Sequence, residues 1–220
     1  MTIKAIDVAK WFIKNKLDSP RNTYEGNMKL QKLLYFAQLI HVAKYDELLF
    51  DDEMRAYRDG TVINNVRLPY RDQHYRLIKE SYEFEGFDNE LVVDTLELTA
   101  EIFGDMTPKE LSKLNHELDS WTIPYNESIV KEEIYSTNKN IINPSDKIFM
   151  DDVNRVKDML EVYLKPNNKL MSTQINGVTF YYDPDNIEIT EDVLNVIENS
   201  EFPEDVYSLT YDEEQGVIIS

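Results

Sequence analysis

The sequence contains no cysteine, six glycines and three histidines. Without cysteine the chain has no disulfide framework, no thiolate metal site and no cysteine nucleophile. No GxGxxG or P-loop pattern occurs among the few glycines, so a phosphate-cradling glycine loop is not expected. This composition fits a protein of the reducing cytoplasm.

Long hydrophobic runs are also missing. No stretch of about 18 apolar residues occurs, so we expect no membrane-spanning helix. Asp7 and Lys10 interrupt the apolar pattern near the N-terminus, where no small-residue cleavage site follows, so this segment does not resemble a signal peptide. Hydrophobic residues make up 42% of 220 residues, which is enough to form a globular core.

Patterns typical of enzymes are absent as well. There is no HExxH or GxSxG motif. His41 lies in a predicted central helix, where a packed histidine is expected, and His74 lies in a charged helix, where a surface position is expected. His116 and Glu117 are adjacent, so a helix would turn them to different faces. The segment 183–188 resembles a calcium loop but lacks its central glycine and distal glutamate. We expect no catalytic residues, no metal ion and no cofactor, although an unrecognised hydrolase using scattered carboxylates and His116 stays open.

The charge of the chain is strongly one-sided. The formal net charge is −19, which repels phosphate and makes nucleic-acid binding an unfavoured function. Residues 171–220 hold twelve of the 42 acidic residues and none of the 23 basic ones, so this segment carries −12 and the rest −7. A solvated acidic face explains this pattern, as does a docking surface for a basic protein or a mimic of a phosphate backbone.

Apolar residues recur at helical spacing through most of the first 165 residues. Asn27 is a candidate N-cap, Pro69 should kink or restart its helix, and Thr107 to Glu110 form a capping-box pattern. Residues 46–63 are expected to form an irregular turn or short strands. The predicted helices span residues 2–17, 28–44, 64–81, 88–103, 108–118 and 145–164, with a weaker one at 127–135.

The pattern changes after Pro166. The pair Asn176–Gly177 favours a hairpin turn, a short helix is predicted over 190–199, and two strands joined by a turn are expected over 205–220. The sequence therefore predicts a mainly α protein: a compact multi-helix domain at residues 1–166, followed by a small acidic α+β appendage at residues 167–220.

Aromatic and acidic residues supply candidate partner contacts. Trp121 is either a plug at the end of the helical bundle or an interface anchor. Tyrosines among carboxylates, with no lysine nearby, suit recognition of arginine or lysine side chains, although they can equally pack the appendage. The candidate partner-binding residues are Trp121, Tyr181, Tyr182, Asp183, Asp185, Glu204, Asp205, Tyr207, Tyr211, Asp212, Glu213 and Glu214.

Three stretches resemble one known family. They are MKLQKLLYFAQ at 28–38, Leu49–Phe50 with MRAYRDGTV at 54–62, and Leu114–His116 followed by Trp121. Together they are similar to the Panacea-type, or SocA-like, antitoxin domain over roughly residues 3–165. Thr61 stands where that family usually has proline, and Tyr57 where tryptophan is common. The acidic appendage lies outside the resemblance.

The resemblance implies a helical, non-enzymatic domain that neutralises a toxin by direct binding, in some members as an adaptor that delivers the toxin to a protease. The family is common on phages and other mobile elements. We therefore expect a cytoplasmic, antitoxin-like protein whose partner is a toxin with a basic surface. The alternative is a phage- or mobile-element-encoded inhibitor of a host defence nuclease, with the acidic appendage mimicking nucleic acid.

Overall fold

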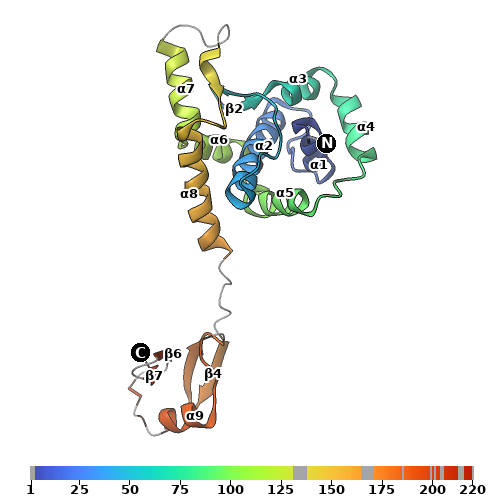
Figure 1. Ribbon diagram of the computed structural model, residues 1–220. Helices are drawn as coiled ribbons and strands as arrows, with labels where there is room; N and C mark the ends of the chain where they lie inside the picture. Colours follow the sequence, from blue (N-terminus) through green and yellow to red (C-terminus); the bar gives the residue numbers. More distant parts are fainter. Residues whose placement is uncertain are drawn as a thin grey trace. The chain divides into compact units, whose positions relative to one another are not determined.

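The computed structural model describes residues 3–130, 138–164, 171–184, 186–198, 200, 202–203, 206–212 and 216–219. The chain divides into two compact units, an N-terminal unit of residues 1–159 and a C-terminal unit of residues 160–220. Figure 1 shows the elements of each unit. The expected domain boundary after residue 166 falls among residues 165–170, outside the described part, and stays a prediction.

Helix α2 (Tyr24–Tyr45) forms the centre of the N-terminal unit, as predicted. Its side chains are buried on every face because α1 (Ala5–Lys14), α5 (Glu90–Phe103) and α6 (Pro108–His116) pack around it. The predicted cap, Asn27, is wrong. The helix begins earlier, and Thr23 accepts a hydrogen bond from the Gly26 backbone N–H at 2.9 Å. A Cβ on Gly26 would lie 2.5 Å from the Asp18 carbonyl oxygen, so close packing explains this glycine within a helix.

The predicted helix over 64–81 is two helices, α3 (Asn64–Asp72) and α4 (His74–Glu83). Pro69 lies inside α3, which continues to Asp72, and the second helix begins after Gln73. The predicted surface position of His74 is wrong. Its side chain is 7% exposed and its ring lies 4.7 Å from that of Tyr70, because α4 turns its His74–Leu77–Ser81 face toward the interior beside α1.

The segment expected to form short strands contains β1 (Met54–Tyr57) and β2 (Gly60–Ile63), an antiparallel hairpin in which Tyr57 pairs with Gly60. The short 3₁₀ helix η1 (Asn138–Asn140) leads into β3 (Ile141–Ile142), which pairs with β1. The two-residue turn between β1 and β2 is Arg58–Asp59, and the order of the strands in the sheet is β2-β1-β3.

The capping box before α6 is confirmed, since Thr107 and Glu110 exchange hydrogen bonds. Helix α7 (Asp119–Val130) was only partly predicted, because sequence placed Trp121 after a helix and a weak helix at 127–135. The backbone N–H of Ser120 donates to Asp152 of α8 (Lys147–Tyr163) at 2.7 Å, so a distant carboxylate satisfies the start of α7. Residues 131–135 lie outside the described part.

The C-terminal unit is the predicted α+β fold. Strands β4 (Met171–Ile175), β5 (Val178–Tyr182), β6 (Val206–Asp212) and β7 (Gly216–Ile219) form one sheet in that order. Strands β5 and β6 run parallel and are connected through α9 (Glu191–Glu198). The Asn176–Gly177 turn has both residues at positive φ, as the hairpin prediction requires. A small apolar cluster packs α9 on the sheet; its buried members are Phe180, Ile187, Val193, Ile197 and Leu209.

Candidate functional site

The three sequence stretches singled out above meet around the β1–β2 hairpin. Lys32 on α2 donates from Nζ to the Thr61 carbonyl oxygen at 2.9 Å. Asn115 on α6 accepts from the Thr61 backbone N–H at 2.5 Å and donates to Thr61 Oγ1 at 3.1 Å. All three side chains are buried, so one polar network ties the central helix, the hairpin and α6 together.

Further contacts join the same stretches. Gln38 on α2 accepts from the backbone N–H groups of Leu49 and Phe50 at 3.1 and 3.2 Å. The Tyr35 hydroxyl forms a buried hydrogen bond with Ser120 at the start of α7. These partners are 11 to 85 residues apart in sequence, so the motif is a tertiary cluster rather than a local signal.

Backbone conformation and close packing explain why position 60 is a glycine. Its φ of +106° is one that side-chain-bearing residues rarely adopt. A Cβ there would lie 2.3 Å from Asn115 Oδ1 and 2.4 Å from Lys32 Cε. Glycine therefore allows the turn to approach the buried lysine and asparagine.

Trp121 is 6% exposed and its indole N–H donates to the Tyr57 carbonyl oxygen at 2.9 Å. Its ring stacks between those of His116, at 3.9 Å, and Tyr125, at 4.6 Å. Of the two roles that sequence left open for Trp121, this burial favours the packing role.

Lys32 is an amine enclosed by protein. Burial lowers its pKa to about 7, against the opposing charge of Asp59. Burial also lowers the pKa of His116, and the positive charge of Lys32 lowers it further. Burial therefore disfavours the charged forms of both Lys32 and His116 at this site.

The lowered pKa of Lys32 predicts a pH dependence of stability. Between pH 7 and 10.5 the unfolded chain binds a proton at this amine that the folded chain has released, so the contribution of Lys32 to the free energy of unfolding rises with pH. We expect this contribution to grow by about 2 kcal/mol between pH 7 and 9. Urea unfolding of Lys32→Met at both values, followed by tryptophan fluorescence, should show a correspondingly smaller change; equal changes in both proteins would contradict it.

A cavity of about 650 Å³ lies beside the hairpin. Its lining contains four basic residues and one acidic residue, although the chain as a whole carries −19. The lining residues are Asn22, Thr23, Tyr24, Asn27, Met28, Gln31, Lys32, Tyr57, Arg58, Asp59, Val62, Arg67, Tyr70 and Arg71. Sequence reasoning missed this site because its cationic side chains come from α2, the hairpin and α3, and no segment alone is basic.

Hydrogen bonds hold the walls of the cavity. Tyr24 donates to Asp59 Oδ2 at 2.5 Å, and this bond, together with burial, raises the pKa of Tyr24 to about 12. The Arg67 guanidinium lies over the Tyr57 ring, 5.8 Å from its centroid. Asn27 donates to the Arg67 carbonyl oxygen at 3.2 Å, which joins α2 to α3.

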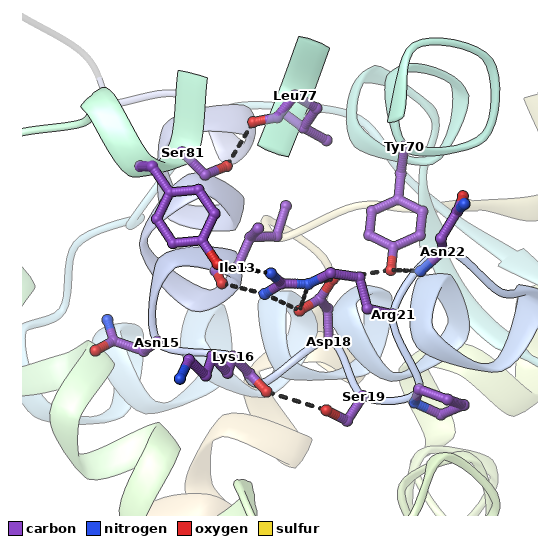
Figure 2. Close-up of polar contacts among 12 residues, drawn as sticks. Ile13, Asn15, Lys16, Asp18, Ser19, Arg21, Asn22, Tyr70, Leu77 and Ser81 are labelled. Atoms are coloured by element: carbon purple, nitrogen blue, oxygen red, sulfur yellow. Dashed lines mark hydrogen bonds and ion pairs between the residues drawn. The ribbon is translucent and has the colours of Figure 1, made fainter. Parts of the chain in front are cut away.

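Tyr70 connects the cavity to a buried ion pair in the loop after α1. Figure 2 shows Asp18 between Arg21 and Tyr70. Asp18 is fully buried; it accepts from Arg21 at 2.9 to 3.1 Å and from the Tyr70 hydroxyl at 2.9 Å. Asp18 raises the pKa of Arg21, whereas burial is the main cause that raises the pKa of Tyr70. This arrangement fixes one wall of the cavity.

The candidate tyrosines of the C-terminal unit separate into two groups. Tyr182 and Tyr207 pack against the apolar cluster, whereas Tyr181 and Tyr211 are 42% and 57% exposed. Tyr181 pairs with Ser208, but Tyr211 pairs with Val217, which belongs to the packed side of the sheet. The two exposed rings therefore lie on opposite faces of the sheet.

The candidate carboxylates are similarly divided. Asp183 is 8% exposed and accepts from the Asn186 side chain at 2.7 Å, which stabilises the turn after β5. Asp212 ends β6 and is half-buried. Asp185, Glu204, Asp205, Glu213 and Glu214 lie outside the described residues. Helix α9 exposes three carboxylates that the sequence analysis did not select: Glu191, Asp192 and Glu198.

Among the described residues, no helix is both long enough and apolar enough to cross a membrane. Residues 30–122 match the family described as Antitoxin SocA-like, Panacea domain. This segment contains the hairpin network and most of the cavity lining, and it confirms the predicted resemblance over that range. No curated protein and no solved structure matches the chain.

Proposed function

We propose that this chain, which carries a SocA-like Panacea domain at residues 30–122, is a non-enzymatic antitoxin that neutralises a protein toxin by direct binding. The observation that carries this proposal is the family match over the segment that forms the hairpin network. The polar network around Lys32, Thr61 and Asn115 is buried and internally bonded, which suits a scaffold better than a site of chemistry. Binding, rather than catalysis, is the activity that such a scaffold supports.

The C-terminal unit is the part that we propose selects the toxin. It carries no basic residue from 171 onward, and α9 exposes Glu191, Asp192 and Glu198 together. A surface of one sign attracts a partner of the opposite sign and speeds its encounter. The exposed ring of Tyr211, on the face of the sheet that packs against α9, adds contact area for arginine or lysine side chains.

The triple variant Glu191→Gln, Asp192→Asn, Glu198→Gln tests this charge. We expect roughly tenfold weaker association with the toxin at low salt, because rim charges act chiefly on the association rate. The measurement is co-purification from the native host, followed by association kinetics with the retained toxin at two salt concentrations and by growth rescue.

A matched control removes the same charge elsewhere. Asp88→Asn, Glu90→Gln, Glu97→Gln alters three exposed carboxylates at or in α5 of the N-terminal unit. This variant should associate with the toxin as the unaltered chain does. If both triple variants behave alike, the C-terminal unit has no special role in toxin selection.

The exposed carboxylates of α9 also favour a second candidate, an inhibitor of a host defence nuclease encoded by a phage or mobile element. In that case the acidic surface mimics nucleic acid, and the chain should compete with DNA for the nuclease groove with a steep salt dependence.

The half-life of the toxin in cells distinguishes a protease adaptor from an antitoxin that only occludes the toxin. An adaptor shortens this half-life, whereas an occluding antitoxin does not.

A further inference from the structure

We propose that the cavity beside the β1–β2 hairpin binds a small phosphate-bearing ligand of nucleotide size. The proposal concerns the N-terminal unit alone and does not depend on which protein the chain neutralises. It rests on three properties of the cavity: its charge, its lining groups and its preformed walls.

The charge of the cavity is the first argument. Arg58 and Arg67 line it together, and within the described residues no carboxylate lies within 4.0 Å of either guanidinium. The single lining carboxylate, Asp59, accepts a hydrogen bond from Tyr24. The positive charges of Arg58 and Arg67 both oppose the rise in the pKa of Tyr24, which lines the same cavity.

These cations match a phosphate better than a single carboxylate. Guanidinium groups bind phosphate oxygens with paired hydrogen bonds, and two of them lining one cavity suit a group of about two negative charges. Such a local concentration of positive charge in a chain of −19 is not expected from composition. The site needs no glycine loop, because side chains from three elements supply the donors.

The remaining lining groups suit a ring with polar edges. Tyr24 and Tyr57 provide aromatic surface, and Asn22 and Asn27 also line the cavity. A volume of about 650 Å³ is within the range of small-molecule sites and is too small for a folded partner. A nucleoside phosphate uses both kinds of surface, whereas inorganic phosphate would leave the aromatic part of the cavity unused.

The walls are already held in place. Gln31 accepts from the Ile63 backbone N–H at 2.7 Å, which fixes α2 to β2. Asn22 donates its backbone N–H to the Tyr70 hydroxyl at 3.1 Å, which fixes the loop before α2 to α3. A cavity whose walls are bonded to one another loses little conformational entropy when a ligand binds.

Titration calorimetry on the full chain tests the proposal. The probes are ATP, GTP and AMP, with adenosine, inorganic phosphate, pyrophosphate and a hexaglutamate peptide as comparisons. We expect at least one nucleotide to bind at least about tenfold more tightly than adenosine, phosphate, pyrophosphate and the peptide. Failure of all three nucleotides to bind, or tighter binding of any comparison probe, would overturn the proposal.

Two variants locate the site. Arg67→Gln and the exposed Arg58→Gln should each weaken nucleotide binding by about tenfold or more, because each removes a charge-assisted contact. The matched control is Arg76→Gln, which alters an exposed arginine on α4 and should bind as the unaltered chain does. If Arg58→Gln and Arg67→Gln both bind as Arg76→Gln does, nucleotides bind elsewhere and the cavity assignment is wrong. Toxin association of the same variants is measured in parallel, so failure here is distinguishable from failure of the antitoxin proposal.

Discussion

Gly60→Ala is expected to destabilise the N-terminal unit by about 4 kcal/mol, because an added Cβ meets both strain and collision. The residue holds a φ of +106°, and the new methyl would lie 2.3 Å from Asn115 Oδ1 and 2.4 Å from Lys32 Cε. Neither neighbour can yield easily, since both are buried and bonded to Thr61. Urea unfolding followed by tryptophan fluorescence reports this unit alone, because Trp11 and Trp121 are the chain's two tryptophans.

Gly86 provides a matched control. Its φ of +108° is nearly the same, yet a Cβ there would meet nothing within 4 Å. Gly86→Ala should therefore lower the free energy of unfolding only by the cost of backbone strain, about 1 kcal/mol. If both variants lost the same stability, the approach of the hairpin to Lys32 and Asn115 would not be what requires glycine at position 60.

Asp18→Ala is expected to cost about 3 kcal/mol, because it leaves the Arg21 guanidinium and the Tyr70 hydroxyl without their shared acceptor. The same loss should loosen the wall of the cavity that Tyr70 forms. We expect a lower urea midpoint in the tryptophan signal and, if nucleotides bind the cavity, a weaker affinity as well.

An exposed ion pair separates burial from charge in this test. Arg71 and Asp72 lie 2.6 Å apart, but both side chains are at least half exposed. Asp72→Ala should leave the unfolding midpoint nearly unchanged, since water already screens this pair. Equal losses in Asp18→Ala and Asp72→Ala would show that burial of Asp18 contributes nothing.

Local physics made several elements predictable. The continuous apolar surface of residues 28–44 indicates a helix enclosed by others, and α2 is enclosed. Thr107, Pro108 and Glu110 form their capping box from residues within one turn. Asn176 and Gly177 adopt the positive φ values that a two-residue hairpin turn requires.

Elements that depend on distant residues were predicted less well. The start of α7 needs Asp152, which lies 32 residues further along the chain than Ser120. The charged neighbours of His74 in the sequence predict a surface position, but packing of α4 against α1 buries its side chain. Asn27 resembles a cap, although Thr23 is the residue whose backbone geometry allows capping.

Local patterns and totals along the sequence suffice for the helical character, the change of pattern near residue 166, the −12 of residues 171–220 and the match of residues 30–122 to the SocA-like Panacea domain. These properties depend on neighbouring residues or on residue counts along the sequence, so they can be recognised without knowledge of tertiary contacts. Only the tertiary structure placed Lys32, Arg58 and Arg67 around one cavity and Asp18 beside Tyr70. Such sites arise where separate elements pack together, and the distance between two side chains in space is not encoded by their separation along the chain.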